Sequence, residues 1–204
     1  MNWFAYVSIC LLTTFSPGPA VILALNNSLC VGSRAAFCSS LGNVTGILCL
    51  ASLSLSGLQY LLQFYPALLS WLKYLGAFYL IYLSGRMLSQ IGLPLDQLAS
   101  GNPAASQLTQ TALFRQGFWV ALSNPKSLVF FTALFPQFLG SAEAQSGKKF
   151  VMLIIFAASA MLSHSVYILA ARWIGQRYRQ SSPPLLWRLL PALCLAGFAC
   201  GFLF

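Results

Sequence analysis

The chain has 204 residues, of which 58% are hydrophobic and only 6% are charged, and its mean hydropathy is +0.77. A soluble domain averages about 25% charged residues, so this composition excludes a water-soluble globular protein and indicates one that lies within a lipid bilayer. The net charge of +9 arises because only Asp96 and Glu143 are acidic. The basic residues flank apolar segments, which is typical of membrane-protein loops and argues against a nucleic-acid partner.

Six apolar segments follow one another along the chain, each long enough for a membrane-spanning helix of about 20 residues. Basic residues are more frequent after the first, third and fifth segments, which predicts that those connections are cytoplasmic and that both termini lie outside. The longest polar interval predicts a linker over 91–113 between a first half, 1–90, and a second half, 114–204, of a single transmembrane domain, 1–204. The segments fall near residues 2–29, 35–62, 68–88, 114–138, 149–174 and 185–204.

Prolines interrupt the first and fourth segments at corresponding places, because Pro17 and Pro125 are 108 positions apart. Proline lacks a backbone N–H and clashes with the preceding helical turn, so each predicts a broken helix. The same shift matches Gly32 with Gly140, and each half then consists of three helices. Since three is odd, the second half must insert upside down relative to the first. The sequence predicts an all-α integral membrane protein with six transmembrane helices, arranged as two inverted three-helix repeats with broken first helices. Chance is the alternative, because proline and glycine are frequent in membrane helices.

The two interruptions also supply candidate binding residues. Ser16-Pro17-Gly18-Pro19 exposes backbone N–H groups at the start of a half-helix, which suits a carboxylate, although a simple kink is the alternative. Lys126 directly follows Asn124-Pro125, and none of the predicted spans contains an Asp or Glu to pair with it. A cation at membrane depth is expensive, so Lys126 either attracts a substrate carboxylate, or snorkels to an interface, or ties down local carbonyls.

Three further polar residues lie at membrane depth. His164 in the fifth segment, with Tyr167 one turn further on, could shuttle protons or be a hydrogen-bonded structural residue. Asn43 lies between Gly42 and Gly46, which favour close helix packing, and it additionally could line a cavity. Such small-residue faces also permit a homo-oligomer. The six cysteines show no metal-ligand spacing, so we expect neither a metal nor a cofactor.

Short motifs at characteristic spacings are spread along nearly the whole chain: Ser16-Pro17-Gly18-Pro19, Ser28-Leu29, Gly32, Arg34, Gly42, Gly46, the run from Lys73 to Leu80, Phe114-Arg115, Gly117, Ser123-Asn124-Pro125-Lys126 and Phe135-Pro136-Gln137-Phe138. Together they resemble the LysE/RhtB family of bacterial amino-acid exporters. The resemblance implies a six-helix, multi-pass protein of the bacterial inner membrane that exports amino acids, as an antiporter driven by the proton gradient. It also implies that Pro17, Gly18, Pro19, Asn124, Pro125 and Lys126 are site residues.

The chain also departs from the family pattern. Ala20 stands where members commonly have Asn, Ala36 where a Gly is typical, and Ser163 where an acid is common. With Lys126 present and no intramembrane carboxylate, a cationic amino acid is a poor substrate. We therefore expect a small neutral amino acid, branched-chain or hydroxylated, with protons as the coupling ion.

Two other classes of function are alternatives to transport. A membrane-embedded enzyme would need a nucleophile, paired acids or a metal cluster, and the sequence offers only serines, His164 and Lys126. A structural membrane subunit without transport activity would have little reason to retain expensive polar groups at membrane depth.

Overall fold

The computed structural model describes residues 2–55, 66–89, 109–131, 135, 138, 146–177 and 185–203. All regular elements in these ranges are helical. Most of the predicted linker, 91–108, lies outside the described residues, and so does Gly140, the predicted counterpart of Gly32. The helices are α1 (Trp3–Phe15), α2 (Pro19–Cys30), α3 (Ser33–Leu53), α5 (Pro66–Ser89), α8 (Gln110–Ser123), α9 (Pro125–Val129), α11 (Ser146–Arg177) and α12 (Leu185–Leu203).

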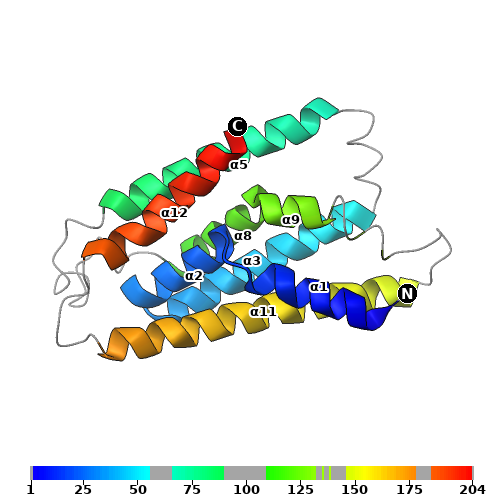
Figure 1. Cartoon of the computed structure of the whole chain (residues 1–204), viewed down its shortest axis with the longest axis horizontal. Helices are drawn as coiled ribbons and strands as arrows, with labels where there is room; N and C mark the ends of the chain where they lie inside the picture. Colours follow the sequence, from blue (N-terminus) through cyan, green and yellow to red (C-terminus); the bar gives the residue numbers. More distant parts are fainter. Residues whose placement is uncertain are drawn as a thin grey trace.

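The helices lie roughly side by side along the long axis of the molecule (Figure 1). α5 and α12 pack together on one side, whereas α1 packs against α11 on the other, with α2, α3 and α8 between them. Helices of the first half therefore pack against helices of the second half: α5 against α12, α3 against α8 and α1 against α11. The site described below is built from both halves.

Both predicted helix interruptions are present. α1 ends at Phe15 and α2 begins at Pro19, and the two axes bend by 52° across the break. Asn124 alone separates α8 from α9, and Pro125 is the first residue of α9. Proline suits the first position of a helix because its missing N–H would have no intrahelical partner there.

By length and composition, two of the described helices could cross a membrane: Ser33–Leu53 and the Gly147–Ile174 part of α11. The bent pair of α1 and α2 makes a third if it is one span. These findings support an all-α membrane protein. The finer arrangement, six spans in two inverted repeats, stays a proposal.

Glycines bring α3 and α8 into backbone contact. A Cβ added to Gly117 would lie 1.7 Å from the Ser39 carbonyl oxygen, and one added to Gly42 would lie 1.9 Å from that of Phe114. At Gly46 the added atom would be 2.7 Å from the Ala121 Cβ. No side chain fits at such distances, so the interpretation of Gly42 and Gly46 as packing residues is confirmed.

Candidate functional site

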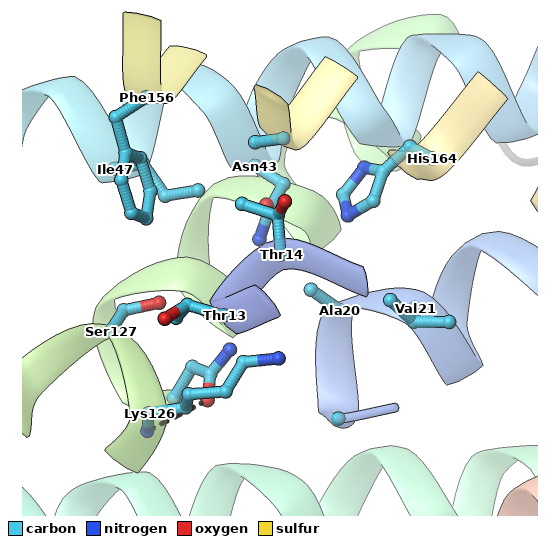
Figure 2. A pocket seen from close by; sticks show the side chains of 13 residues that line it. Thr13, Thr14, Ala20, Val21, Asn43, Ile47, Lys126, Ser127, Phe156 and His164 are labelled. Carbon is cyan, nitrogen blue, oxygen red and sulfur yellow. Dashed lines mark hydrogen bonds between the residues drawn. The ribbon is translucent and has the colours of Figure 1, made fainter. Parts of the chain in front are cut away.

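A cavity lies where both helix breaks meet α3 and α11 (Figure 2). It measures about 30 Å³, counted as the space open to the centre of a water molecule. One water needs roughly 10–15 Å³ on that measure, so the cavity has room for about two. Its lining comes from the end of α1, the start of α2, the middle of α3 and α11, and the second break: Thr13, Thr14, Gly18, Ala20, Val21, Asn43, Ile47, Asn124, Lys126, Ser127, Phe156, Ala160 and His164.

Five of the predicted site residues line this cavity, although they are far apart in the sequence: Gly18, Asn43, Asn124, Lys126 and His164. The other five lie around it. Ser16 is exposed and bonded to Lys126, Pro17 is exposed, and Pro19 is buried in the first turn of α2. Pro125 opens α9, and Tyr167 is bonded to the end of α1.

Side chains donate hydrogen bonds to the backbone carbonyls that lose their helical partners at the first break. A helix leaves its last four carbonyls without intrahelical partners, and here the second half of the chain supplies three donors. Ser163 Oγ donates to Thr14 O at 2.8 Å, Tyr167 Oη to Phe15 O at 2.7 Å, and Lys126 Nζ to Ser16 O at 2.6 Å. The end of α1 is thus held in place by α9 and α11.

Lys126 is half-buried and connects the two breaks directly. Besides Ser16 O, its Nζ contacts Ser16 Oγ at 3.1 Å. An ammonium has three N–H donors, so one remains for another partner. A Cβ added to Gly18 would lie 3.4 Å from Nζ, which places the ammonium beside the start of α2. Of the alternatives for Lys126, the structure shows a bond to one free backbone carbonyl, that of Ser16 at the other break. A role of Lys126 toward a substrate stays a prediction.

The start of α2 has no side-chain cap. Gly18 is its N-cap, and the first intrahelical bond runs from Ile22 N to Gly18 O. Pro19 has no N–H, so the amides of Ala20 and Val21 are the two that lack a partner within the helix. Both residues line the cavity. Uncapped N–H groups at a helix start, with the positive end of the helix dipole, favour an anion.

The start of α9 differs, because Asn124 caps it. Asn124 Oδ1 accepts a hydrogen bond from Lys126 N at 3.1 Å, in the manner of an N-cap residue. The capping bond also fixes the backbone from which the Lys126 side chain extends. Asn124 therefore has a structural task in addition to its place in the cavity wall.

Asn43 and His164 point into the cavity from α3 and α11 (Figure 2). Asn43 is 2% exposed and His164 is 4% exposed. Asn43 Nδ2 donates to Gly117 O at 3.5 Å. Within the described part of the chain, Asn43 Oδ1 and His164 Nδ1 are buried and have no hydrogen-bond partner.

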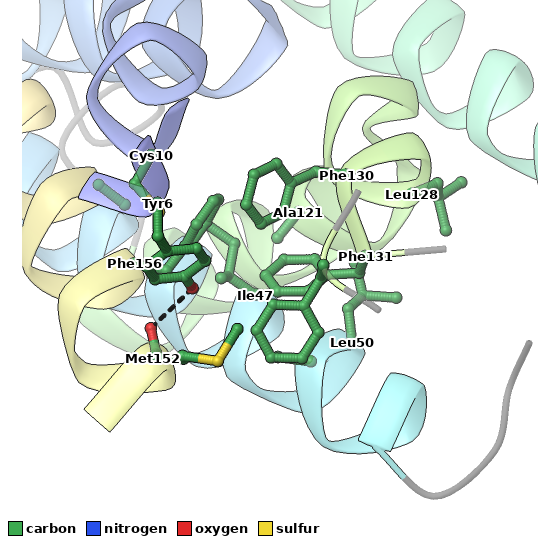
Figure 3. Packing of buried hydrophobic residues seen from close by; sticks show 13 residues of the cluster. Tyr6, Cys10, Ile47, Leu50, Ala121, Leu128, Phe130, Phe131, Met152 and Phe156 are labelled. Atoms are coloured by element: carbon green, nitrogen blue, oxygen red, sulfur yellow. Dashed lines mark hydrogen bonds between the residues drawn. The ribbon is translucent and has the colours of Figure 1, made fainter. Parts of the chain in front are cut away.

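An apolar cluster closes one side of the cavity (Figure 3). Ile47 and Phe156 belong both to the cavity wall and to this cluster, which includes Phe130 and Phe131. Tyr6 is buried in the same cluster, and its hydroxyl donates to Met152 O at 2.9 Å. Val21 and Ala160 extend the apolar lining.

Sequence reasoning missed several lining residues. Thr13 and Thr14 come directly before the first interruption and Ser127 directly follows Lys126, so proximity to the prolines could have identified these polar residues. The apolar Ile47, Phe156 and Ala160 carry no comparable signal, because apolar residues are common throughout the chain.

A family model described as LysE type translocator matches residues 11–204. The chain belongs to the LysE family of translocators. The chain is similar to the leucine efflux protein of Salmonella choleraesuis (strain SC-B67), with 28% identity over 75% of this chain and 70% of the relative. The leucine efflux protein of Enterobacter sp. (strain 638) is 24% identical over 98% of this chain and 93% of its own length. No solved structure matches the chain.

Membership of the LysE family makes the chain a transporter and not an enzyme. The family and the efflux relatives support amino-acid export by a multi-pass membrane protein. The resemblance to the LysE/RhtB family is therefore confirmed.

Proposed function

We propose that the protein is a secondary active exporter of neutral amino acids in the bacterial inner membrane, driven by the proton gradient. The observation that carries the proposal is a cavity between two broken helices, with a lysine and an uncapped helix start in its wall but no carboxylate among its lining residues. Leucine is a natural candidate because relatives are named leucine efflux proteins.

The carboxylate of the amino acid binds at the first break. Ala20, Val21 and Lys126 all line the cavity, and the Lys126 ammonium lies beside Gly18 at the start of α2. Charge-assisted hydrogen bonds of this kind are roughly twice as strong as neutral ones. Ser16, Pro17 and Pro19 contribute indirectly, by shaping the break, and Asn124 and Pro125 contribute by positioning Lys126.

The side chain of the amino acid contacts the apolar wall of Val21, Ile47, Phe156 and Ala160. Without a carboxylate in the lining, a lysine or arginine side chain would add a charge that nothing neutralises. A neutral and predominantly apolar substrate fits both features.

Transport requires the cavity to widen, because room for about two waters is less than an amino acid needs. The hydrogen bonds at the end of α1 are the contacts that must rearrange, since they join the first break to α9 and α11. Movement of one three-helix repeat against the other would open the site alternately to each side of the membrane.

Proton coupling is assigned to His164, which lines the cavity and whose imidazole can gain and lose a proton. Tyr167, proposed with it on the basis of sequence, instead holds the Phe15 carbonyl through its hydroxyl. That contact favours a structural role for Tyr167 over a place in a proton path.

The test is efflux from cells preloaded with radiolabelled amino acids. Cells expressing the protein should release leucine or another neutral amino acid faster than cells with an empty vector, and a protonophore should abolish the difference. Labelled lysine serves as the charged comparison and should be released at the vector rate. Equal release from both cell types across neutral and charged amino acids would refute the proposal.

A further inference from the structure

We propose that Asn43 and His164 bind the α-ammonium group of the transported amino acid, so that the protein recognises an ammonium with neutral acceptors instead of a carboxylate. The inference rests on the proposed export of amino acids and goes beyond it. It specifies which end of a zwitterion meets which wall of the cavity.

Two buried polar atoms of the cavity wall have no partner. Asn43 Oδ1 and His164 Nδ1 are shielded from solvent, and neither has a hydrogen-bond partner among the described residues. With the His164 proton on Nε2, Nδ1 is an acceptor, as the amide oxygen is. Buried polar atoms in native proteins nearly always have partners, because leaving one unpaired is unfavourable. Two such atoms in the wall of one cavity indicate that a ligand completes them.

The amide oxygen of Asn43, and not its nitrogen, is the atom that is free for a ligand. Asn43 Nδ2 donates to Gly117 O, and a carbonyl can only accept, so the amide cannot be flipped without losing this bond. The amide oxygen is therefore the atom left over. Asn43 and His164 are not bonded to each other, which leaves both free to accept from a third group.

Thr14 offers a third acceptor beside them. Its hydroxyl lines the cavity and uses its proton on Leu11 O at 3.3 Å, so the oxygen lone pairs remain for a donor. An α-ammonium has three N–H groups, and the wall formed by Asn43, His164 and Thr14 supplies an acceptor for each.

The positive charge of the cavity lies away from Asn43 and His164. Lys126 enters the cavity from the opposite side in Figure 2, next to the uncapped start of α2. One wall thus carries donors and positive charge, whereas the other carries unpaired acceptors. A zwitterion has the complementary arrangement, with its carboxylate toward Lys126 and its ammonium toward Asn43 and His164.

A consequence is that a proton and the substrate exclude each other at His164. A protonated imidazole has donors on both nitrogens and cannot accept from an ammonium. The cavity would then contain the charges of His164, Lys126 and the substrate ammonium against a single carboxylate. Tyr167 on the same helix is bonded to Phe15, and the residues that line the cavity from the packed helices do not titrate: Thr13, Thr14, Ala20, Val21, Asn43 and Ile47.

The experiment is competition binding to the purified full-length protein, with radiolabelled leucine as the probe. Two analogues compete: the α-hydroxy acid of leucine, in which a hydroxyl replaces the ammonium, and isoamylamine, which lacks the carboxylate. In Asn43→Leu we expect leucine to lose about tenfold or more in affinity while the hydroxy acid changes little, since only leucine loses a bond to a charged group. In Asn43→Asp, which keeps the acceptor and adds a charge, isoamylamine should bind at least tenfold more tightly.

Lys126→Met tests the opposite end of the substrate, the carboxylate. This variant should reduce the preference for leucine over isoamylamine but not the preference for leucine over the hydroxy acid. Tyr167→Phe removes a buried hydrogen bond outside the cavity, so it should leave both preferences unchanged. Unchanged preferences in Asn43→Leu, with leucine still bound, would overturn the ammonium site and leave the export proposal standing. If the wild type binds none of the three compounds, both proposals fail.

A second measurement tests whether protonation of His164 prevents binding of the substrate. Leucine affinity of the wild type should fall as the pH is lowered through the range in which His164 gains a proton, because an imidazolium cannot accept a hydrogen bond from the substrate ammonium. In His164→Asn the amide oxygen can accept in place of Nδ1 but cannot be protonated, so this fall in affinity should be absent. A variant that keeps the wild-type pH dependence would overturn the role of His164.

Discussion

The two helix breaks have similar sequences but satisfy their backbones in different ways. At the first break, three side chains from the second half of the chain hold the carbonyls of α1, and no side chain caps α2. At the second break, Asn124 caps α9 from within the same segment. Residues distant in the sequence therefore stabilise the first break, whereas a residue of the second break itself caps the helix that follows it.

This difference separates two tasks. A break with free N–H groups can bind an anion, and a break that is already capped can position a side chain. In this protein the capped break carries Lys126, and Lys126 reaches across to the uncapped one. A proline in a membrane helix thus indicates where polar backbone is freed, but the neighbouring residues decide what that backbone does.

The largest effect is expected from separating the two breaks. Gly117→Ala places a methyl group 1.7 Å from the Ser39 carbonyl oxygen, so α8 must move away from α3 and take the second break with it. We expect a loss of about 3 kcal/mol in stability, which lowers the melting temperature in detergent by roughly 10 °C. Gly85→Ala is the control, because nothing lies within 4 Å of the added atom. Equal melting temperatures for the two variants would contradict the close contact.

The next effect concerns the bond that joins the breaks. Lys126→Met keeps much of the length of the side chain but removes the donor to Ser16 O. A hydrogen bond to a charged group contributes about 1.5–3 kcal/mol, so the initial rate of leucine efflux should fall roughly tenfold or more. Lys126→Arg retains the charge and should keep more activity than Lys126→Met. Wild-type efflux in Lys126→Met would show that transport needs neither the bond between the two breaks nor the charge of the lysine.

Exchanging the caps sharpens the comparison further. Gly18→Asn gives α2 the capping residue that α9 already has, and the extended backbone of Gly18, with φ of −160°, accepts any residue. Capping should leave stability nearly unchanged, since glycine and asparagine caps differ by a few tenths of a kcal/mol. The capped N–H groups are no longer free for a carboxylate, so efflux should fall about tenfold at low substrate concentration. An N-cap that leaves efflux intact would argue against carboxylate binding at the start of α2.

The smallest effect is expected at the anchor of α1. Tyr167→Phe removes the bond to the Phe15 carbonyl and should cost about 1 kcal/mol, measured as a small drop in melting temperature. If Tyr167 is only an anchor, the pH dependence of efflux should match that of the wild type. A shifted pH profile would instead support the place in proton coupling that the sequence suggested.

The breaks were predictable from the sequence because proline acts locally. Pro17 and Pro125 remove backbone bonds wherever they lie, and the structure has a break at each. Lys126 and His164 were identifiable for a related reason, since ionisable groups are rare at membrane depth and unfavourable without a role. All these residues can be identified from the sequence without knowledge of the fold.

The partners of these residues were not predictable. Nothing in the sequence links Ser163 to Thr14, or Tyr167 to Phe15, because each pair meets only when α11 packs against α1. Long-range packing decides these contacts, and one sequence carries no direct signal of it. The capping bond of Asn124 is different, because it reaches only two residues along the chain. An asparagine directly before a proline that begins a helix is a local signal that could have identified this cap.

The backbone contact between Ser39 and Gly117 has a consequence for biogenesis. The ribosome delivers α3 before α8, so the nascent chain first presents a glycine groove and the Asn43 amide without their cover. We therefore expect the translocon or the surrounding lipid to cover this groove until α8 emerges, and membrane insertion and final assembly to be separate steps.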